Sequence, residues 1–211
     1  MQQNPPSQFT RVRRAPQRGA YDLPTIHAIL DAGTVCHIGH VIDGRPVVTP
    51  VFYWRQENQV YWHGSTASRM VRAALSQEVC LTVSLLDEWV LARSAFHHSA
   101  NYRSVVCLGR PALVDDREAK LAAMKGFVER LFPGRWERLR PPTEREIKAT
   151  AILSLALIEA SAKVRTGPPV DDPEDLSWPI WVGRLPLHTT AGPPIAAPDM
   201  LGSHEPPAPP A

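Results

Sequence analysis

The sequence has few cysteines, almost no net charge and no long apolar run. Its three cysteines are an odd number and no two form a C-x-x-C pair, so the sequence excludes a structural zinc site and favours buried, reduced thiols. The 23 basic and 21 acidic side chains leave a net charge of +2, which gives no electrostatic reason for binding nucleic acid. Every apolar stretch is broken before the roughly 18 residues that a membrane span needs. The first residues also lack the apolar core of a secretory signal, so we expect a cytoplasmic protein with no nucleic-acid or membrane partner.

The common catalytic signatures are also absent. The sequence contains no G-x-G-x-x-G or G-K-[ST] loop, no G-x-S-x-G nucleophile and no H-E-x-x-H metal motif. His37 and His40 have the spacing H-x-x-H, but they lie in a predicted strand, where side chains three positions apart face opposite sides. They cannot share a metal, and we expect no bound metal.

Proline, in contrast, is abundant and unevenly placed. Of 22 prolines, 12 lie between Pro168 and Pro210. The last stretch has almost nothing to bury, so it cannot recover an ordering entropy of about 1–2 kcal/mol per residue. The first residues are similarly polar. We therefore predict disordered tails at residues 1–18 and 188–211, and one folded domain at residues 19–187.

Between the tails, the pattern predicts short strands joined by turns such as Asp43-Gly44 and Glu57-Asn58. We expect strands at residues 34–42, 46–55, 59–63, 78–86, 88–96, 103–114 and 152–164. Helices are expected from Asp22 to a stop at Gly33, and at residues 66–75, 116–132 and 143–150. The opening strands lack the crossover helices that a parallel sheet requires. The fold class is therefore mainly β (α+β), an antiparallel barrel of about seven strands with peripheral helices.

Two segments carry candidate binding residues. In YWHGSTASRM, residues 61–70, a strand ends at His63, a turn with Gly64 and Ser65 follows, and Ser68 and Arg69 open a helix. Free backbone N–H groups, hydroxyls and a guanidinium at a helix N-terminus favour a phosphate. The alternative is that Ser65 simply caps the helix and Arg69 is solvated.

The second segment, residues 94–114, gathers polar and aromatic groups where a buried strand begins. They are His97, His98, Asn101, Tyr102, Arg103 and Ser104. Such a rim suits a planar, hydrogen-bonding ligand. A polar hairpin loop that satisfies its own backbone is the alternative.

Together these segments resemble the pyridoxamine 5′-phosphate oxidase-like superfamily of FMN-binding split barrels. Three segments are similar to sequences of its flavin-nucleotide-binding and nitroimidazole-resistance proteins: RGAYDLPTIHAILDAG, YWHGSTASRM and LARSAFHHSANYRSVV. The resemblance implies a six- to seven-stranded antiparallel split β-barrel that forms a homodimer, with each flavin held between two subunits. The apolar faces of strands 46–55 and 152–164 are consistent with a dimer. Met70 replaces the family's Lys and Ser104 replaces its Gln, which changes two flavin contacts.

The resemblance also implies a function, an FMN-binding oxidoreductase that passes electrons or hydride to a small substrate. Ser65, Ser68 and Arg69, next to Gly64, would hold the phosphate. The ring would lie along the strand that carries Val48, Thr49, Pro50 and Val51, with His63 nearby. Tyr102, Arg103 and Ser104 would reach the flavin from the rim or from the partner subunit.

The chemistry of the site leaves alternatives open. His63, His97 and His98 are the candidate catalytic residues because only histidines titrate near neutral pH. A non-catalytic flavin- or haem-binding protein would use one of these histidines as an axial ligand, and a reductase dependent on deazaflavin F420 would need a basic groove. Oxidation of pyridoxamine phosphate itself is not expected, because Arg184 is the lone basic residue between Leu176 and Leu187.

Overall fold

The computed structural model describes residues 4–202 and 204–208, which form one long antiparallel sheet with helices around it. The strands are β1 (Gly19–Ala20), β2 (Val35–Ile42), β3 (Arg45–Gln56), β4 (Gln59–Ser65), β5 (Val79–Leu91), β6 (Ser99–Gly109), β7 (Ala112–Leu113), β8 (Thr150–Ala156), β9 (Glu159–Arg165) and β10 (Gly183–Pro186). The helices are α1 (Leu23–Ala32), α2 (Arg69–Ser76), α3 (Arg117–Leu131) and α4 (Glu144–Ala149), with short 3₁₀ turns at Pro16–Arg18, Trp136–Arg138 and Pro173–Asp175.

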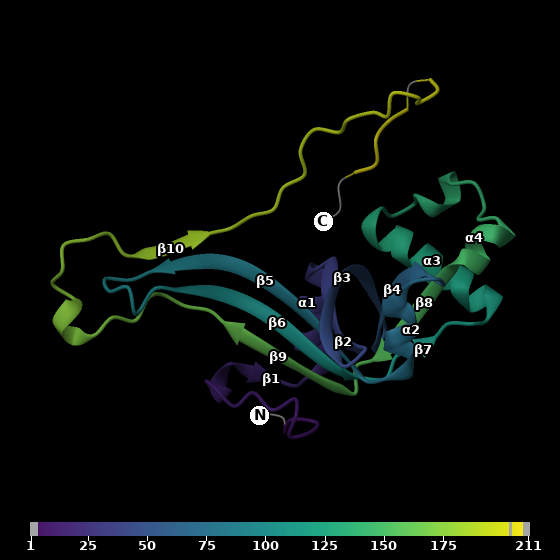
Figure 1. The fold of residues 1–211 in the computed structure, drawn as a ribbon. Helices are drawn as coiled ribbons and strands as arrows, with labels where there is room; N and C mark the ends of the chain where they lie inside the picture. Colours follow the sequence, from purple (N-terminus) through teal and green to yellow (C-terminus); the bar gives the residue numbers. More distant parts are fainter. Residues whose placement is uncertain (1–3, 203, 209–211) are drawn as a thin grey trace.

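The sheet order is β1-β9-β6-β5-β2-β3-β4-β8-β7, and β10 pairs with β5 at the side. Every pairing is antiparallel, as the turn-rich sequence predicts. The sheet curls into an open barrel with the helices α2, α3 and α4 gathered at one end (Figure 1). The split-barrel class is confirmed, but the expected strand count of six to seven is wrong. The described residues contain ten strands, because the sequence pattern misses the shortest ones and merges others.

Two predicted strand boundaries are corrected. Residues 78–86 and 88–96 are not two strands, since β5 continues through a register shift between Leu86 and Glu88. The predicted strand 152–164 is instead two strands, β8 and β9, which a turn at residues 157–158 separates. This turn contains Leu157 and Ile158 rather than Gly, Pro or Asn, so the sequence gives no signal that a turn is present there.

A long arm leaves the barrel on the side opposite α3 and α4 (Figure 1). It consists of the far ends of β5 and β6, with β9 along one edge and β10 along the other. The tip is held by Asp171, whose carboxylate accepts hydrogen bonds of 2.8 Å from both the backbone N–H and the guanidinium of Arg93. The segment after β9 is therefore tied back onto the β5–β6 loop.

Side-chain alternation divides the buried residues into two layers. On β3, Tyr53 faces the main core and Trp54 faces α3, while on β4 Trp62 faces the core. The main core includes Cys36 and Cys107, and burial raises the pKa of each thiol to about 12. The three cysteines are free, as predicted, but Cys80 is only partly buried, so the expected burial is wrong for that thiol. The second layer holds Trp54, Ala123 and Ile152, with Tyr61, Val114, Met124 and Phe127 packed against them.

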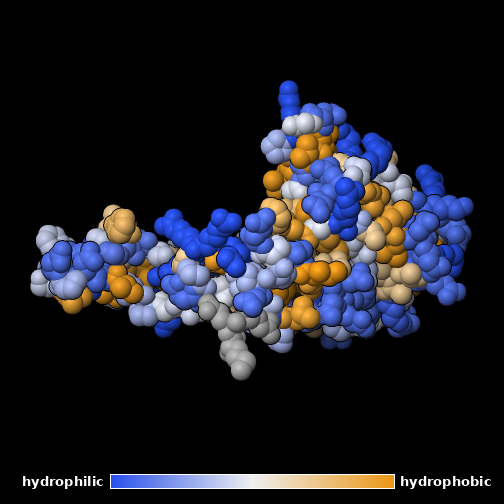
Figure 2. Space-filling model, turned by 90° about the horizontal axis from the view of Figure 1, so that it is seen from below, coloured by the Kyte–Doolittle hydropathy of each residue, from blue (hydrophilic) through white to orange (hydrophobic). Residues whose placement is uncertain are grey.

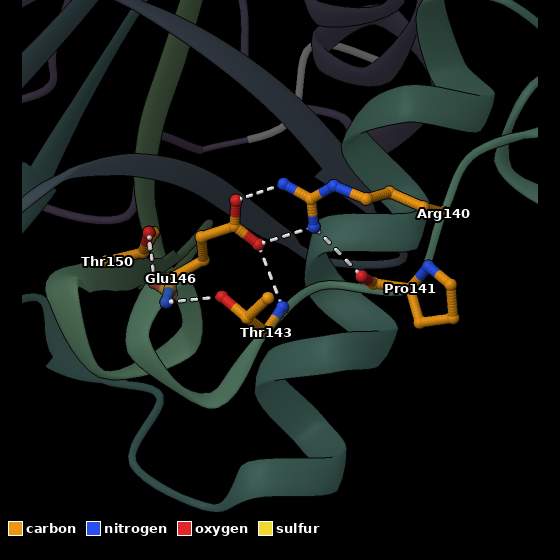
Figure 3. Close-up of polar contacts among 5 residues, drawn as sticks. All are labelled: Arg140, Pro141, Thr143, Glu146 and Thr150. Atoms are coloured by element: carbon orange, nitrogen blue, oxygen red, sulfur yellow. Dashed lines mark hydrogen bonds and ion pairs between the residues drawn. The ribbon is translucent and has the colours of Figure 1, made fainter.

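The expected helix of residues 143–150 forms as α4, and its start is a capping box (Figure 3). Thr143 Oγ1 accepts from the Glu146 backbone N–H at 3.3 Å, and the Glu146 carboxylate accepts from the Thr143 N–H at 2.8 Å. Arg140 donates to the same carboxylate from the other side. The guanidinium and then the N–H of Thr143 lower the pKa of Glu146 to about 2.

The ends of the chain are partly described. Thr10 is buried, and the backbone N–H of Val12 donates to the Tyr21 hydroxyl at 2.9 Å. The disorder expected for residues 1–18 and 188–211 stays a prediction. In the described part of the chain, no helix is long and apolar enough to cross a membrane.

Candidate functional site

The junction between β4 and α2 brings the first group of predicted residues together. α2 begins at Arg69 with Ser68 as its N-cap residue, and the Ser68 side chain makes no capping bond. The Ser65 hydroxyl accepts from the Ala67 N–H at 3.2 Å, so Ser65 closes the turn and does not cap the helix. The first helical bond runs from Arg72 N–H to Ser68 O, which leaves the first-turn N–H groups of α2 without helical partners. These donors, with two hydroxyls, form a site suited to an anion.

The guanidinium of Arg69 is held only weakly. Among the residues that the structure describes, its one ion pair is with Asp43 at 3.5 Å, and the two side chains are 71% and 88% exposed. An exposed pair of this kind contributes little to stability because water and salt screen it. Arg69 is therefore available to an incoming phosphate.

Gly64 serves the packing of this junction. A Cβ at Gly64 would lie 2.9 Å from Val71 Cγ2, on the buried side of α2. The glycine thus lets α2 approach β4 closely and so sets the position of Ser68 and Arg69.

The predicted ring-binding residues on β3 do not share one face. Thr49 and Val51 face the barrel interior and are partly buried, whereas Pro50 faces outward and is exposed. The outward face next to Pro50 is apolar, since Val48 is 64% and Phe52 is 55% exposed. A flat ligand along this strand would contact Val48, Pro50 and Phe52 by their side chains.

His63 lies under α3 rather than on an open surface. Its ring centroid is 5.1 Å from that of Phe127 and 6.3 Å from that of Trp54. Burial lowers the pKa of His63, so the imidazole is neutral near pH 7. The ring borders a cavity of about 230 Å³, lined by Trp54, His63, Met124, Phe127, Val128, Trp136, Thr150 and Ile152.

Tyr102, Arg103 and Ser104 lie on β6 between β5 and β9. The Arg103 guanidinium donates to both carboxylate oxygens of Asp87, with Nη2–Oδ1 at 2.7 Å and Nε–Oδ2 at 3.0 Å. Among the described residues, no hydrogen bond or ion pair joins this group to Ser68 or Arg69. Within one chain, the described hydrogen bonds and ion pairs therefore do not join the two predicted groups.

The two adjacent histidines at the arm tip have different partners. His97 Nε2 lies 3.2 Å from the carboxylate of Asp172. His98 Nδ1 lies 2.8 Å from the carbonyl of Ser94, and only a donating Nδ1–H can make that bond. Nearby, the amide of the buried Asn101 donates to the carboxylate of Glu88 and to the Gly167 carbonyl.

Sequence reasoning missed the acidic partners of this region, Asp87, Asp171 and Asp172. Arg93 and Asp171 are 78 residues apart in the chain, so no local pattern links them. Among the described residues, no group of three or more His, Cys, Asp and Glu side chains is placed to hold a metal ion.

The open antiparallel barrel and the serine–arginine turn at α2 define a flavin-binding split barrel. Comparison with known families agrees, because the model of the pyridoxamine 5′-phosphate oxidase family matches residues 22–164. The chain belongs to this flavin-binding family, which confirms the resemblance seen in the sequence.

Three solved structures describe the similarity. A flavocytochrome from Azotobacter vinelandii, Anf3, is 48% identical with a TM-score of 0.91, over 94% of this chain and 93% of its own. An FAD- and haem-binding protein from Mycobacterium smegmatis is 33% identical with a TM-score of 0.83, over 87% and 91% of the two chains. A putative 5-nitroimidazole antibiotic resistance protein from Bacteroides thetaiotaomicron shares the fold at 18% identity and a TM-score of 0.59, over 69% and 86%. No curated protein matches the chain.

Proposed function

We propose that this protein binds a flavin and a haem and transfers electrons to a small substrate. The proposal draws on the two similar structures above 30% identity, one described as a flavocytochrome and the other as an FAD- and haem-binding protein. When bound, the flavin supplies hydride or single-electron chemistry, and the protein supplies its placement and electrostatics. The histidines of the sequence make haem an alternative to FMN, and the two relatives favour a chain that holds both groups.

The observation that carries the flavin part is the β4–α2 junction. It offers a weakly paired guanidinium at Arg69, the uncommitted hydroxyl of the N-cap Ser68 and the first-turn N–H groups of α2. A phosphate fits this donor set because the helix dipole and the guanidinium act in the same direction. FMN is the smallest flavin with such a phosphate, and FAD carries a phosphate at the same position, the end of its ribityl group.

A homodimer would complete the flavin site. Tyr102, Arg103 and Ser104 lie on β6, which pairs with β5 and β9 and not with β4, so we infer that they reach the flavin from a second subunit. The apolar outward side chains of β2 and β3 provide a surface for that contact. They are Val35, Val41, Val48 and Phe52, which are between 42% and 64% exposed. Exposed apolar side chains also gather in bands over the barrel body (Figure 2).

Two rival activities are less well supported. A reductase dependent on deazaflavin F420 needs a continuous basic groove, but Arg103 is engaged by Asp87 and lies on a different element from Arg69. Oxidation of pyridoxamine phosphate needs free cations after the last long strand, and there Arg184 pairs with Glu88 at 3.3 Å. We propose a different small substrate and a cytoplasmic location.

The flavin proposal is tested by binding and by one charge-removing variant. We expect the purified protein to bind FMN or FAD with a dissociation constant below about 1 mM. Arg69→Ala should weaken FMN binding by about 10- to 150-fold, since a charge-assisted contact contributes about 1.5–3 kcal/mol. Riboflavin, which has the ring without the phosphate, should be bound equally by both proteins.

Arg72→Ala is the matched control, because Arg72 lies on the same helix and is also exposed. Its flavin affinity should stay close to that of the wild type. Equal weakening of FMN and riboflavin by Arg69→Ala would assign Arg69 to the fold instead of the phosphate. A wild-type protein that binds neither flavin nor haem would overturn the proposed function.

A further inference from the structure

A haem site needs three features from the chain. An imidazole nitrogen must present its lone pair to the iron, and the other ring nitrogen must be held by a hydrogen bond that fixes the tautomer. An apolar hollow of several hundred Å³ must cover the macrocycle. The histidines of this chain can be compared on these three features.

Three of the histidines fail at least one requirement. The cavity beside His63, at about 230 Å³, is below the usual range of about 300–1,000 Å³ for ligand pockets. The Nε2 of His97 is held by Asp172, but His97 does not line the apolar hollow on the arm. His40 donates from Nδ1 to the Ile38 carbonyl, but its ring is 5% exposed and its Nε2 is buried without access to solvent.

His98 meets all three requirements. Its Nδ1–H donates to the Ser94 carbonyl, so the lone pair is on Nε2, and the side chain is exposed. It borders a hollow of about 530 Å³ on the arm, whose other lining residues are Trp89, Val90, Leu91, Ser99 and Leu185. The lining is apolar apart from His98 and Ser99.

The groove is built by strand pairing and is open in the single chain. Leu185 of β10 stands opposite Trp89 of β5, and both side chains are nearly half exposed, at 47% and 48%. Small groups of apolar residues are visible along the arm in Figure 2. A macrocycle seated here would remove these two side chains from water, which stabilises the complex in proportion to the apolar area covered.

The loop that carries His98 is held in place. The Ser94 carbonyl that accepts from His98 also accepts from the His97 N–H at 3.2 Å. One residue before it, Arg93 is fixed by the nearly buried carboxylate of Asp171. The imidazole is therefore presented by a pre-organised turn, as a ligand on a metal site requires.

We propose that His98 Nε2 is the axial ligand of the haem and that the hollow on the face of the paired strands β5 and β10 holds the macrocycle. This inference rests on the proposed haem binding and assigns its place in the fold. Within one chain it assigns the haem to the arm and the flavin phosphate to α2.

The test is a titration of haem-free full-length protein with ferric haem, followed by the Soret band. We expect His98→Ala to weaken haem binding more than about tenfold, because the iron loses its protein ligand. Added imidazole should restore the wild-type Soret position in His98→Ala by replacing the missing side chain. His188→Ala, an exposed histidine outside the arm, is the matched control and should titrate like the wild type.

A second variant tests the groove without touching the ligand. Leu185→Glu places a carboxylate opposite Trp89 and should also weaken haem binding, while FMN affinity stays unchanged in both variants and reports an intact fold. If the wild type shows no Soret band with haem, the proposed haem function fails. If the wild type binds and His98→Ala binds equally well, or if His63→Ala or His97→Ala alone removes the axial signature, the assignment to His98 is wrong.

Discussion

Gly33, which ends α1, provides a quantitative test of how the helix is packed against the barrel. Its φ of −107° is accessible to any residue, so the position does not need glycine for a left-handed turn. The reason is space, because a Cβ at Gly33 would lie 2.7 Å from the Tyr53 hydroxyl and 3.1 Å from Val83 Cγ1. That hydroxyl is itself fixed, since it donates to the Leu30 carbonyl at 2.6 Å.

Gly33→Ala should therefore destabilise the fold. Inserting a methyl into a packed site costs about 1–3 kcal/mol, and the smaller unfolded-state entropy of alanine offsets only about 0.4–1 kcal/mol. Tyr53→Phe alone should cost about 1 kcal/mol, because it removes one buried hydrogen bond. In the double variant the hydroxyl that clashes is gone, so the two losses should not add.

The assay is a double-mutant cycle of unfolding free energies from urea denaturation. We expect the double variant to be more stable than the sum of the single losses by at least about 0.5 kcal/mol. Gly39→Ala is the control, since its Cβ would meet nothing closer than the Cys80 carbonyl at 3.5 Å. Strict additivity at Gly33 and Tyr53, or an unchanged stability of Gly33→Ala, would refute the close approach.

Three further outcomes follow from the described contacts. Burial lowers the pKa of His63, so the unfolded chain takes up a proton at a higher pH than the folded protein does. The free energy of unfolding should therefore be unaffected by this group above about pH 7.5 and should decrease as the pH falls through about 6.5, the ordinary pKa of histidine. The melting temperature of His63→Gln, measured over the same pH range, should lack this part of the decrease. Thr143→Ala removes the N-cap of α4 and should cost about 1 kcal/mol, seen as a melting temperature about 2–4 °C lower. Removing residues 190–211 should shift the melting temperature by less than about 4 °C, whereas removing residues 183–211 also deletes β10 and its pairing with β5 and should lower it further.

The sequence predicts the local features well because their causes are local. Asp22 caps α1 by accepting from the Thr25 N–H at 2.9 Å, and α1 ends before Gly33 as expected. The turns at Asp43-Gly44 and Glu57-Asn58 are present, with positive φ at Asp43, Gly44 and Glu57. Each of these signals lies within four residues of the structure that it determines.

The errors arise where a distant contact decides the outcome. The pattern places Asp87 between two predicted strands, with Glu88 opening the second, yet β5 continues through both residues. Asp87 is satisfied by Arg103, and Glu88 by Asn101, both from the neighbouring strand β6. A charged pair in the sequence therefore marks a bulge whose partners lie at least 13 residues away.

The candidate site follows the same rule. The group at Gly64, Ser65, Ser68 and Arg69 could be predicted because one strand–turn–helix segment contains it. The tautomer of His98, in contrast, follows from the conformation of the turn at Ser94, and the groove beside it requires Leu185, which is 87 residues further along the chain. The sequence places both histidines at a polar rim. Only the folded arm shows that His98 borders the apolar hollow, whereas the Nε2 of His97 is paired with Asp172.

The exposed apolar surface connects these sites. A single chain leaves Val48 and Phe52 on the barrel, and Trp89 and Leu185 on the arm, about half exposed to water or more. Apolar side chains gathered on one face reduce solubility unless a ligand or a second subunit covers them. The barrel face lies on the proposed flavin strand and the arm face beside His98, so each proposed cofactor would cover an exposed apolar surface. The same residues therefore argue for bound cofactors and for a second subunit, and cofactor binding and dimerisation should stabilise one another.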